Sequence, residues 1–148
     1  MDKVLSIDPS GTGTTGIYFK NGAKEEFKQI KEKDWIKHYH FISSLVKVYQ
    51  PNFLLFENTN FIRLRGKDMT SLFKLLGALE VMEIEKVKSV PVDQVKRMVK
   101  ELLIGNKQIT EIEYQKGRGK GWMFKGSRIS LHCLEAYLVY YLFKEYGF

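Results

Sequence analysis

A chain of 148 residues, 44% hydrophobic and 14% aromatic, is long enough for one compact domain with its own core and too short for two. Its formal net charge of +7 favours a polyanionic partner, and the single cysteine, Cys133, excludes an internal disulfide or a cysteine-based zinc cluster. No apolar signal core opens the chain, and no stretch approaches the roughly 20 apolar residues of a membrane span. We therefore expect a cytoplasmic protein with no membrane partner.

The first third of the chain is typical of an antiparallel meander followed by a helix. The predicted strands span residues 4–8, 15–19 and 24–30. A Gly/Thr-rich turn follows the first strand, and Asn21-Gly22, a strong hairpin signal, precedes the third. From Asp34 onward apolar residues recur at helical spacing, which predicts a helix that is capped by Asp34 and ends before Pro51.

Strands and helices alternate in the rest of the chain. The apolar run at 53–56 predicts a central strand buried on both faces, and 87–90 predicts a short strand. Helices are predicted over residues 69–85, 91–105 and 130–145, the second opened by Pro91 and capped by Gly105-Asn106. Residues 106–127 have no regular period and are interpreted as a basic, glycine-rich loop. This order predicts one α/β domain over residues 1–148, with a mixed sheet covered by helices.

Three acidic residues occupy positions where acids are rare. Asp8 and Glu57 each end an apolar strand, and Glu135 interrupts the apolar helix LHCLEAYLVYYL. If the first and fourth strands are neighbours, Asp8 and Glu57 meet at their carboxyl ends, and His132 shares a helix face with Glu135. Carboxylates gathered in this way repel one another unless a hard cation neutralises them. The pattern therefore predicts a site for Mg²⁺, with Mn²⁺ able to substitute.

Each of these residues also has an ordinary structural explanation. Asp8 could simply open a turn before Pro9, and Glu57 could face solvent at the end of its strand. His132 could be a hydrogen-bonded helix histidine, and Glu135 could point outward from a helix that is mostly buried. The metal-site interpretation is favoured because all four fall at an element end or on the one helix face that such a site requires.

Four motifs resemble those of RuvC-type Holliday junction resolvases. IDPSGTGTTGI resembles their first strand and glycine-rich turn, and LLFEN resembles the strand that carries their glutamate. SVPVDQVKRMVKELLIG is similar to the strand and helix that follow, and ISLHCLEAYLVYYL resembles their last helix, whose paired residues lie three apart. The likeness covers nearly the whole chain in order. It departs at Glu135, where the family usually has Asp, and in the Gly- and Lys-rich segment before the last helix.

The resemblance implies an RNase H-like fold with a mixed five-stranded sheet flanked by helices, a homodimer, and Mg²⁺-dependent nicking of branched DNA. Residue by residue, it carries the catalytic and metal-binding roles onto Asp8, Glu57, His132 and Glu135. The implied mechanism is hydrolysis with two metal ions per site, roughly 4 Å apart. Asp8 would bridge both ions, and Glu57 and Glu135 would each bind one. His132 would either ligate a metal or orient or deprotonate the attacking water.

Two basic segments are candidates for holding the DNA. In the first, cations alternate with glycines and aromatics, a composition that suits phosphates and unpaired bases. Its predicted contacts are Lys116, Arg118, Lys120, Trp122, Lys125 and Arg128. The second follows Glu57 and comprises Phe61, Arg63, Arg65 and Lys67. The alternatives are a solvated loop for the first segment and a core position for Phe61.

Three other functions compete with this interpretation. The Asp-then-Gly/Thr hairpin also binds phosphate in actin-like ATPases and sugar kinases, but those proteins need two such lobes and 148 residues hold one. We therefore expect no nucleotide cofactor. A different RNase H-like nuclease, acting on flaps or on RNA–DNA hybrids, would use the same carboxylates. A non-catalytic nucleic-acid-binding module is disfavoured because all four candidate ligands are present.

Overall fold

The structure of this protein, a computed structural model, describes residues 2–58 and 67–147. Its strands are β1 (Lys3–Asp8), β2 (Thr14–Asn21), β3 (Lys24–Lys31), β4 (Phe53–Asn58), β5 (Lys86–Pro91), β6 (Ile112–Gln115), β7 (Gly121–Phe124) and β8 (Ser127–Ile129). Its helices are α1 (Trp35–Tyr49), α2 (Lys67–Glu80), α3 (Val92–Ile104) and α4 (Leu131–Tyr146). None of the described helices is long and apolar enough to cross a membrane.

The main sheet has five strands in the order β3-β2-β1-β4-β5. Strands β1 to β3 form the predicted antiparallel meander, and Gly22 at its second turn has a φ of 62°, which suits the hairpin signal. Strands β4 and β5 join parallel to β1, with Ile7 opposite Phe56. The predicted mixed α/β sheet flanked by helices is confirmed, and the first and fourth strands are neighbours, which is the condition for Asp8 and Glu57 to meet.

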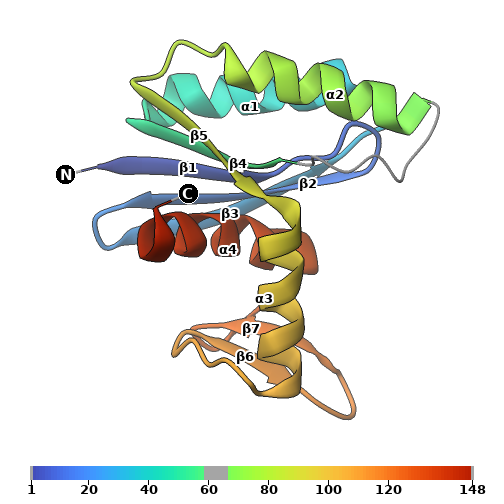
Figure 1. The fold of residues 1–148 in the computed structure, drawn as a ribbon, viewed down its shortest axis with the longest axis vertical. Coiled ribbons are helices and arrows are strands. Elements are labelled where there is room, and N and C mark those ends of the chain that lie inside the picture. The colour runs from blue at the N-terminus through green and yellow to red at the C-terminus, as the bar shows by residue number, and fades with distance from the viewer. Residues whose placement is uncertain (1, 59–66, 148) are drawn as a thin grey trace.

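Helices cover both faces of this sheet (Figure 1). Helices α1 and α2 lie on one face, where Leu5 and Ile7 of β1 pack among leucines and isoleucines of both helices. Helix α4 lies on the other face, and the Ser6 hydroxyl donates a hydrogen bond to the Ala136 carbonyl oxygen at 2.7 Å. Burying each large aliphatic side chain stabilises the fold by about 1.5–3 kcal/mol. Alternate residues of β1 thus fix a helix layer on each side of the strand that carries Asp8.

The predicted helix boundaries hold at most ends. The Asp34 carboxylate accepts a hydrogen bond from the Ile36 amide at 3.0 Å and caps α1, and α3 begins directly after Pro91 and ends at Gly105. Helix α2 ends at Glu80, five residues before the predicted end. Helix α4 is apolar over most of its surface because the sheet, α3 and β7 all contact it.

The segment predicted as a loop, residues 106–127, contains two strands, and together with β8 it forms a second sheet in the order β6-β7-β8. The loop prediction was wrong because its strands are three or four residues long and are separated by glycine-rich turns, which conceals the strand period. Phe124 is buried, with its ring centroid 4.9 Å from that of Tyr137 on α4. The small sheet lies at the far end of α3 from the main sheet (Figure 1).

Candidate metal centre

Two neighbouring parallel strands place the first two carboxylates. Asp8 is the last residue of β1, and Glu57 directly follows the Phe56 that pairs with Ile7. The carboxyl ends of β1 and β4 therefore meet at one edge of the sheet, as the sequence predicts. Asp8 is 7% exposed, so its carboxylate is held within the protein and does not simply open a solvated turn.

A glycine brings the third carboxylate to the same edge. Gly16 of β2 pairs with Asp8, and a Cβ atom at Gly16 would lie 2.1 Å from the carbonyl oxygen of His132. Only a residue without a side chain allows the first turn of α4 to lie this close to the strand. That approach places Glu135, 3% exposed, beside Asp8.

The turn between β1 and β2 is fixed on two sides. A Cβ atom at Gly11 would lie 2.6 Å from the backbone nitrogen of Leu72, so the turn packs directly on α2. On the other side the Ser10 amide donates to Oγ1 of Thr15 at 3.0 Å, and that oxygen lies 2.8 Å from Nδ1 of the fully buried His38. Packing on α2 and the hydrogen bonds through Thr15 thus hold the backbone that follows Asp8 in a fixed position.

Asp8, Glu57 and Glu135 form one compact group. Among the described residues, one oxygen from each of these carboxylates lies within 4.8 Å of the other two. Oε2 of Glu57 is buried and has no hydrogen-bond partner in the described part of the chain. A buried carboxylate oxygen without a donor is costly, and a hard cation is the partner that such an oxygen suits best.

The pKa shifts of these carboxyl groups also favour a bound cation. Burial, with the charges of Asp8 and Glu135, raises the pKa of Glu57 to about 9. Burial also raises the pKa of Asp8, against the opposing effect of its hydrogen bond with His132. The three carboxyl groups therefore do not all ionise readily at neutral pH without a cation, and a divalent cation would favour their ionised forms.

His132 lies at the margin of this group. Its Nδ1 is 3.4 Å from Oδ2 of Asp8, and its side chain is 46% exposed. The contact with Asp8 raises the pKa of His132, although partial burial opposes the rise. Three of the four predicted site residues thus form the group of oxygens, and the fourth contacts Asp8 from the solvent side.

Lys96 on α3 also belongs to the site, and it is not among the residues predicted from the sequence. Its Nζ donates to both carboxylate oxygens of Glu135 at 2.8 Å. A sequence signal was present: Lys96 stands four residues after Val92 and three before Val99, so it interrupts the apolar stripe of its helix. Glu135 was singled out by the same kind of interruption.

No protein-family model and no curated protein sequence matches this chain. Among the solved structures that resemble it, two match over almost their full length. RuvC of T. thermophilus in complex with a Holliday junction substrate has a TM-score of 0.63 and 16% identity over 99% of this chain and 95% of that one. A second structure of Thermus thermophilus RuvC has a TM-score of 0.55 and 18% identity over 98% and 96%. The chain has the RuvC fold. The predicted likeness to RuvC-type resolvases is confirmed in the fold.

Of the basic residues predicted to hold DNA in the segment before α4, some are exposed in a turn and others contact groups within the protein. Lys116, Arg118 and Lys120 are exposed in the β6–β7 turn. Lys125 forms an ion pair with Glu25 on β3, and the Arg128 guanidinium donates to the carbonyl oxygens of Gly119 and Lys120 at 2.6 and 3.2 Å. Lys125 thus links the small sheet to the main sheet, and Arg128 fixes the shape of the turn.

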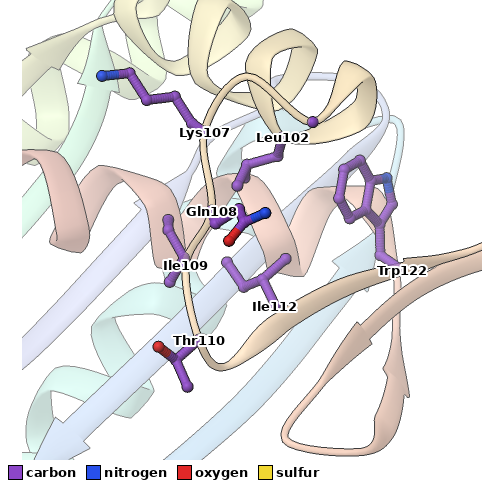
Figure 2. Close-up of a pocket in the computed structure, with 8 residues that line it drawn as sticks. Leu102, Lys107, Gln108, Ile109, Thr110, Ile112 and Trp122 are labelled. Atoms are coloured by element: carbon purple, nitrogen blue, oxygen red, sulfur yellow. The ribbon is translucent and has the colours of Figure 1, made fainter.

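Trp122 is buried, so its indole is packed within the protein. Its ring centroid lies 4.9 Å from that of Tyr114, and it lines a pocket with Leu102 and Ile112 beside the end of α3 (Figure 2). The second predicted surface lies mostly outside the described residues, which include neither Phe61, Arg63 nor Arg65. Lys67 is the first residue of α2.

Proposed function

We propose that this chain is a divalent-metal-dependent endonuclease that nicks branched DNA, with the four-way junction as its main substrate. The observation that carries the proposal is the buried group of Asp8, Glu57 and Glu135, which three separate elements bring within 4.8 Å on a RuvC fold. Three carboxylates gathered in a buried position are unfavourable because burial opposes their ionisation, and a bound cation would offset this cost.

The donors in this group fit Mg²⁺ or Mn²⁺. All are carboxylate oxygens, which hard cations prefer, and Oε2 of Glu57 has no other partner among the described residues. We propose two ions per site, with Asp8 as the shared ligand and Glu57 and Glu135 each binding one. When bound, divalent cations stabilise the negative charge that develops on a phosphodiester during hydrolysis.

His132 would act as the general base that accepts the proton of the attacking water. It is half-exposed, so water reaches the ring, and its Nδ1 faces the Asp8 carboxylate. The Asp8 charge stabilises a protonated imidazole, so a proton accepted by His132 would be held there. Among the two roles that the sequence leaves open, this contact favours the general base over the metal ligand.

The β6–β7 turn would hold DNA beside the metal centre. Trp122 pairs with Ile129, and the next residue, Ser130, caps the helix that carries His132. The turn at the start of β7 therefore lies at the end of the small sheet that leads into the site. We propose that its exposed cations, Lys116, Arg118 and Lys120, neutralise phosphates that flank the cut. The region that holds Phe61, Arg63, Arg65 and Lys67 is proposed as a second contact.

We also propose a homodimer, because resolving a four-way junction takes two symmetry-related cuts. Helix α2 is the candidate interface: Phe73 is 39% exposed on it, and Val81, just beyond its end, is 78% exposed. Within α2, Phe73 and the exposed Gly77 are four residues apart and so share one face of the helix. Sedimentation at micromolar concentration tests this, and a monomer there and on junction DNA would contradict it.

A panel of labelled DNA substrates tests the proposed activity. Four-way junction, three-way junction, flap, plain duplex and RNA–DNA hybrid would each be incubated with Mg²⁺ or Mn²⁺. We expect paired nicks in the four-way junction, no nicking by Asp8→Asn, and normal nicking by Asp2→Asn, which alters an exposed carboxylate just before β1. Faster cutting of the flap or hybrid would assign the alternative nuclease, and junction binding without cutting under either metal would refute the nuclease.

A further inference from the structure

Lys96 reaches into the carboxylate group from α3, an element that supplies none of the three carboxylates. Its Nζ is 2.8 Å from both oxygens of Glu135, so the ammonium is shared evenly by the carboxylate. The Glu135 side chain is only 4% exposed, whereas the Lys96 side chain is 58% exposed. The carboxylate is thus held in place by its burial, and the lysine has room to move away from it.

The charge of Lys96 acts on the whole group. Burial raises the pKa of Asp8, of Glu57 and of Glu135, and the Lys96 ammonium lowers the pKa of each. In return, the hydrogen bond to Glu135 and the three acidic charges raise the pKa of Lys96, although partial burial opposes the rise. Lys96 therefore does in part what a divalent cation would do: it favours the ionised carboxylates.

The lysine and a metal ion would need the same oxygens. Both oxygens of Glu135 accept a hydrogen bond from Lys96, and one of them belongs to the group of oxygens that could hold an ion. A cation that enters must share Glu135 with the ammonium or displace it, and like charges a few ångströms apart repel strongly in a partly buried site. The flexible four-carbon stem of lysine allows displacement toward solvent.

We propose that Lys96 is a tethered counter-cation of the metal centre. Its ammonium holds the three carboxylates together while no divalent cation is bound, and it lowers the affinity of the centre for such a cation by competing for Glu135. This inference rests on the metal centre proposed above. It makes Lys96 a positioning residue that sets metal affinity through Glu135.

Mn²⁺ binding tests this directly, with free Mn²⁺ measured by its paramagnetic resonance signal at fixed pH and ionic strength. For Lys96→Met we expect binding at least about tenfold tighter than wild type, which corresponds to about 1.4 kcal/mol. Lys96→Arg keeps the charge and should not bind more tightly than wild type. Lys100→Met removes the same charge from an exposed position one turn later on α3 and should bind as wild type does.

A second measurement separates this role from a purely structural one. In the presence of a chelator, Lys96→Met should melt at a lower temperature than Lys100→Met, and added Mn²⁺ should more than restore its stability. If Lys96→Met does not fold, Lys96→Gln replaces it in both measurements.

The outcomes distinguish this inference from the proposed function. Mn²⁺ binding that is unchanged or weaker in Lys96→Met would overturn the counter-cation and leave the nuclease standing. Tighter binding without nicking of any DNA would support the counter-cation and refute the nuclease. Absence of Mn²⁺ binding in every variant would overturn the metal centre and the counter-cation together.

Discussion

Replacing Glu57 by glutamine should stabilise the metal-free protein while it abolishes metal-dependent activity. Burial and the neighbouring Asp8 and Glu135 charges raise the pKa of Glu57 from its ordinary 4.5 to about 9. The folded protein therefore keeps Glu57 protonated at a pH where the unfolded chain releases that proton. The stability that the protonated group contributes is fully present below pH 4.5 and is lost as the pH rises toward 9. Glutamine has nearly the same shape and never ionises.

The expected gain in the free energy of unfolding follows from the shifted pKa of Glu57. At pH 7.5, three pH units above 4.5, an upper bound is about 4 kcal/mol, because each unit is worth about 1.4 kcal/mol. The Lys96 charge and water at the edge of the site reduce this, so we expect Glu57→Gln to gain about 1–3 kcal/mol. For a domain of this size that corresponds to a rise in melting temperature of about 3–10 °C. At pH 5 the two proteins should be nearly equal.

Thermal denaturation with a chelator at pH 5, 6.5, 8 and 9 measures the effect, and Glu83→Gln, at an exposed position, is the matched control. The gap between wild type and Glu57→Gln should widen as the pH rises, and Glu83→Gln should follow wild type throughout. Added Mg²⁺ or Mn²⁺ should stabilise wild type and not Glu57→Gln. A gap that does not depend on pH, or a Glu57→Gln protein that is less stable than wild type at pH 8, would refute this reasoning.

Two further predictions concern the scaffold of the site. Gly16→Ala should lower the free energy of unfolding by about 2 kcal/mol or more and weaken Mn²⁺ binding, because its methyl group would lie 2.1 Å from the His132 carbonyl oxygen and push α4 from the sheet. Gly77→Ala is its control: a Cβ there meets nothing within 4 Å, so a stability gain of up to about 1 kcal/mol is expected, and urea denaturation compares the two. Asp34→Ala removes the hydrogen bond to the Ile36 amide at the start of α1 and should cost about 1 kcal/mol in the same assay. Equal effects of the two glycine substitutions, or an unchanged Asp34→Ala midpoint, would contradict these assignments.

The sequence carries clear evidence for the strands and helices that place the three carboxylates. Apolar runs that end in Asp8 and Glu57, and an apolar helix interrupted by Glu135, are visible because burial leaves a periodic trace in neighbouring residues. Asp34 and Pro91 mark helix starts for equally local reasons: one supplies a cap and the other lacks an amide hydrogen. These signals predict the elements that form the main sheet and their order along the chain, whereas the order of the strands within the sheet depends on tertiary contacts.

The small sheet, the close contact at Gly16 and the pairing of Lys96 with Glu135 depend on tertiary structure alone. The sheet β6-β7-β8 has strands of three or four residues, which are too short to show a period, and its pairing depends on how Phe124 packs against α4. Whether Gly16 is a turn residue or a contact point depends on the distance to a helix over a hundred residues later. Lys96 and Glu135 are 39 residues apart, so no local pattern pairs them. Composition and periodicity report which side chains are buried, but the identity of the partner in a buried contact is set by the packing of whole elements.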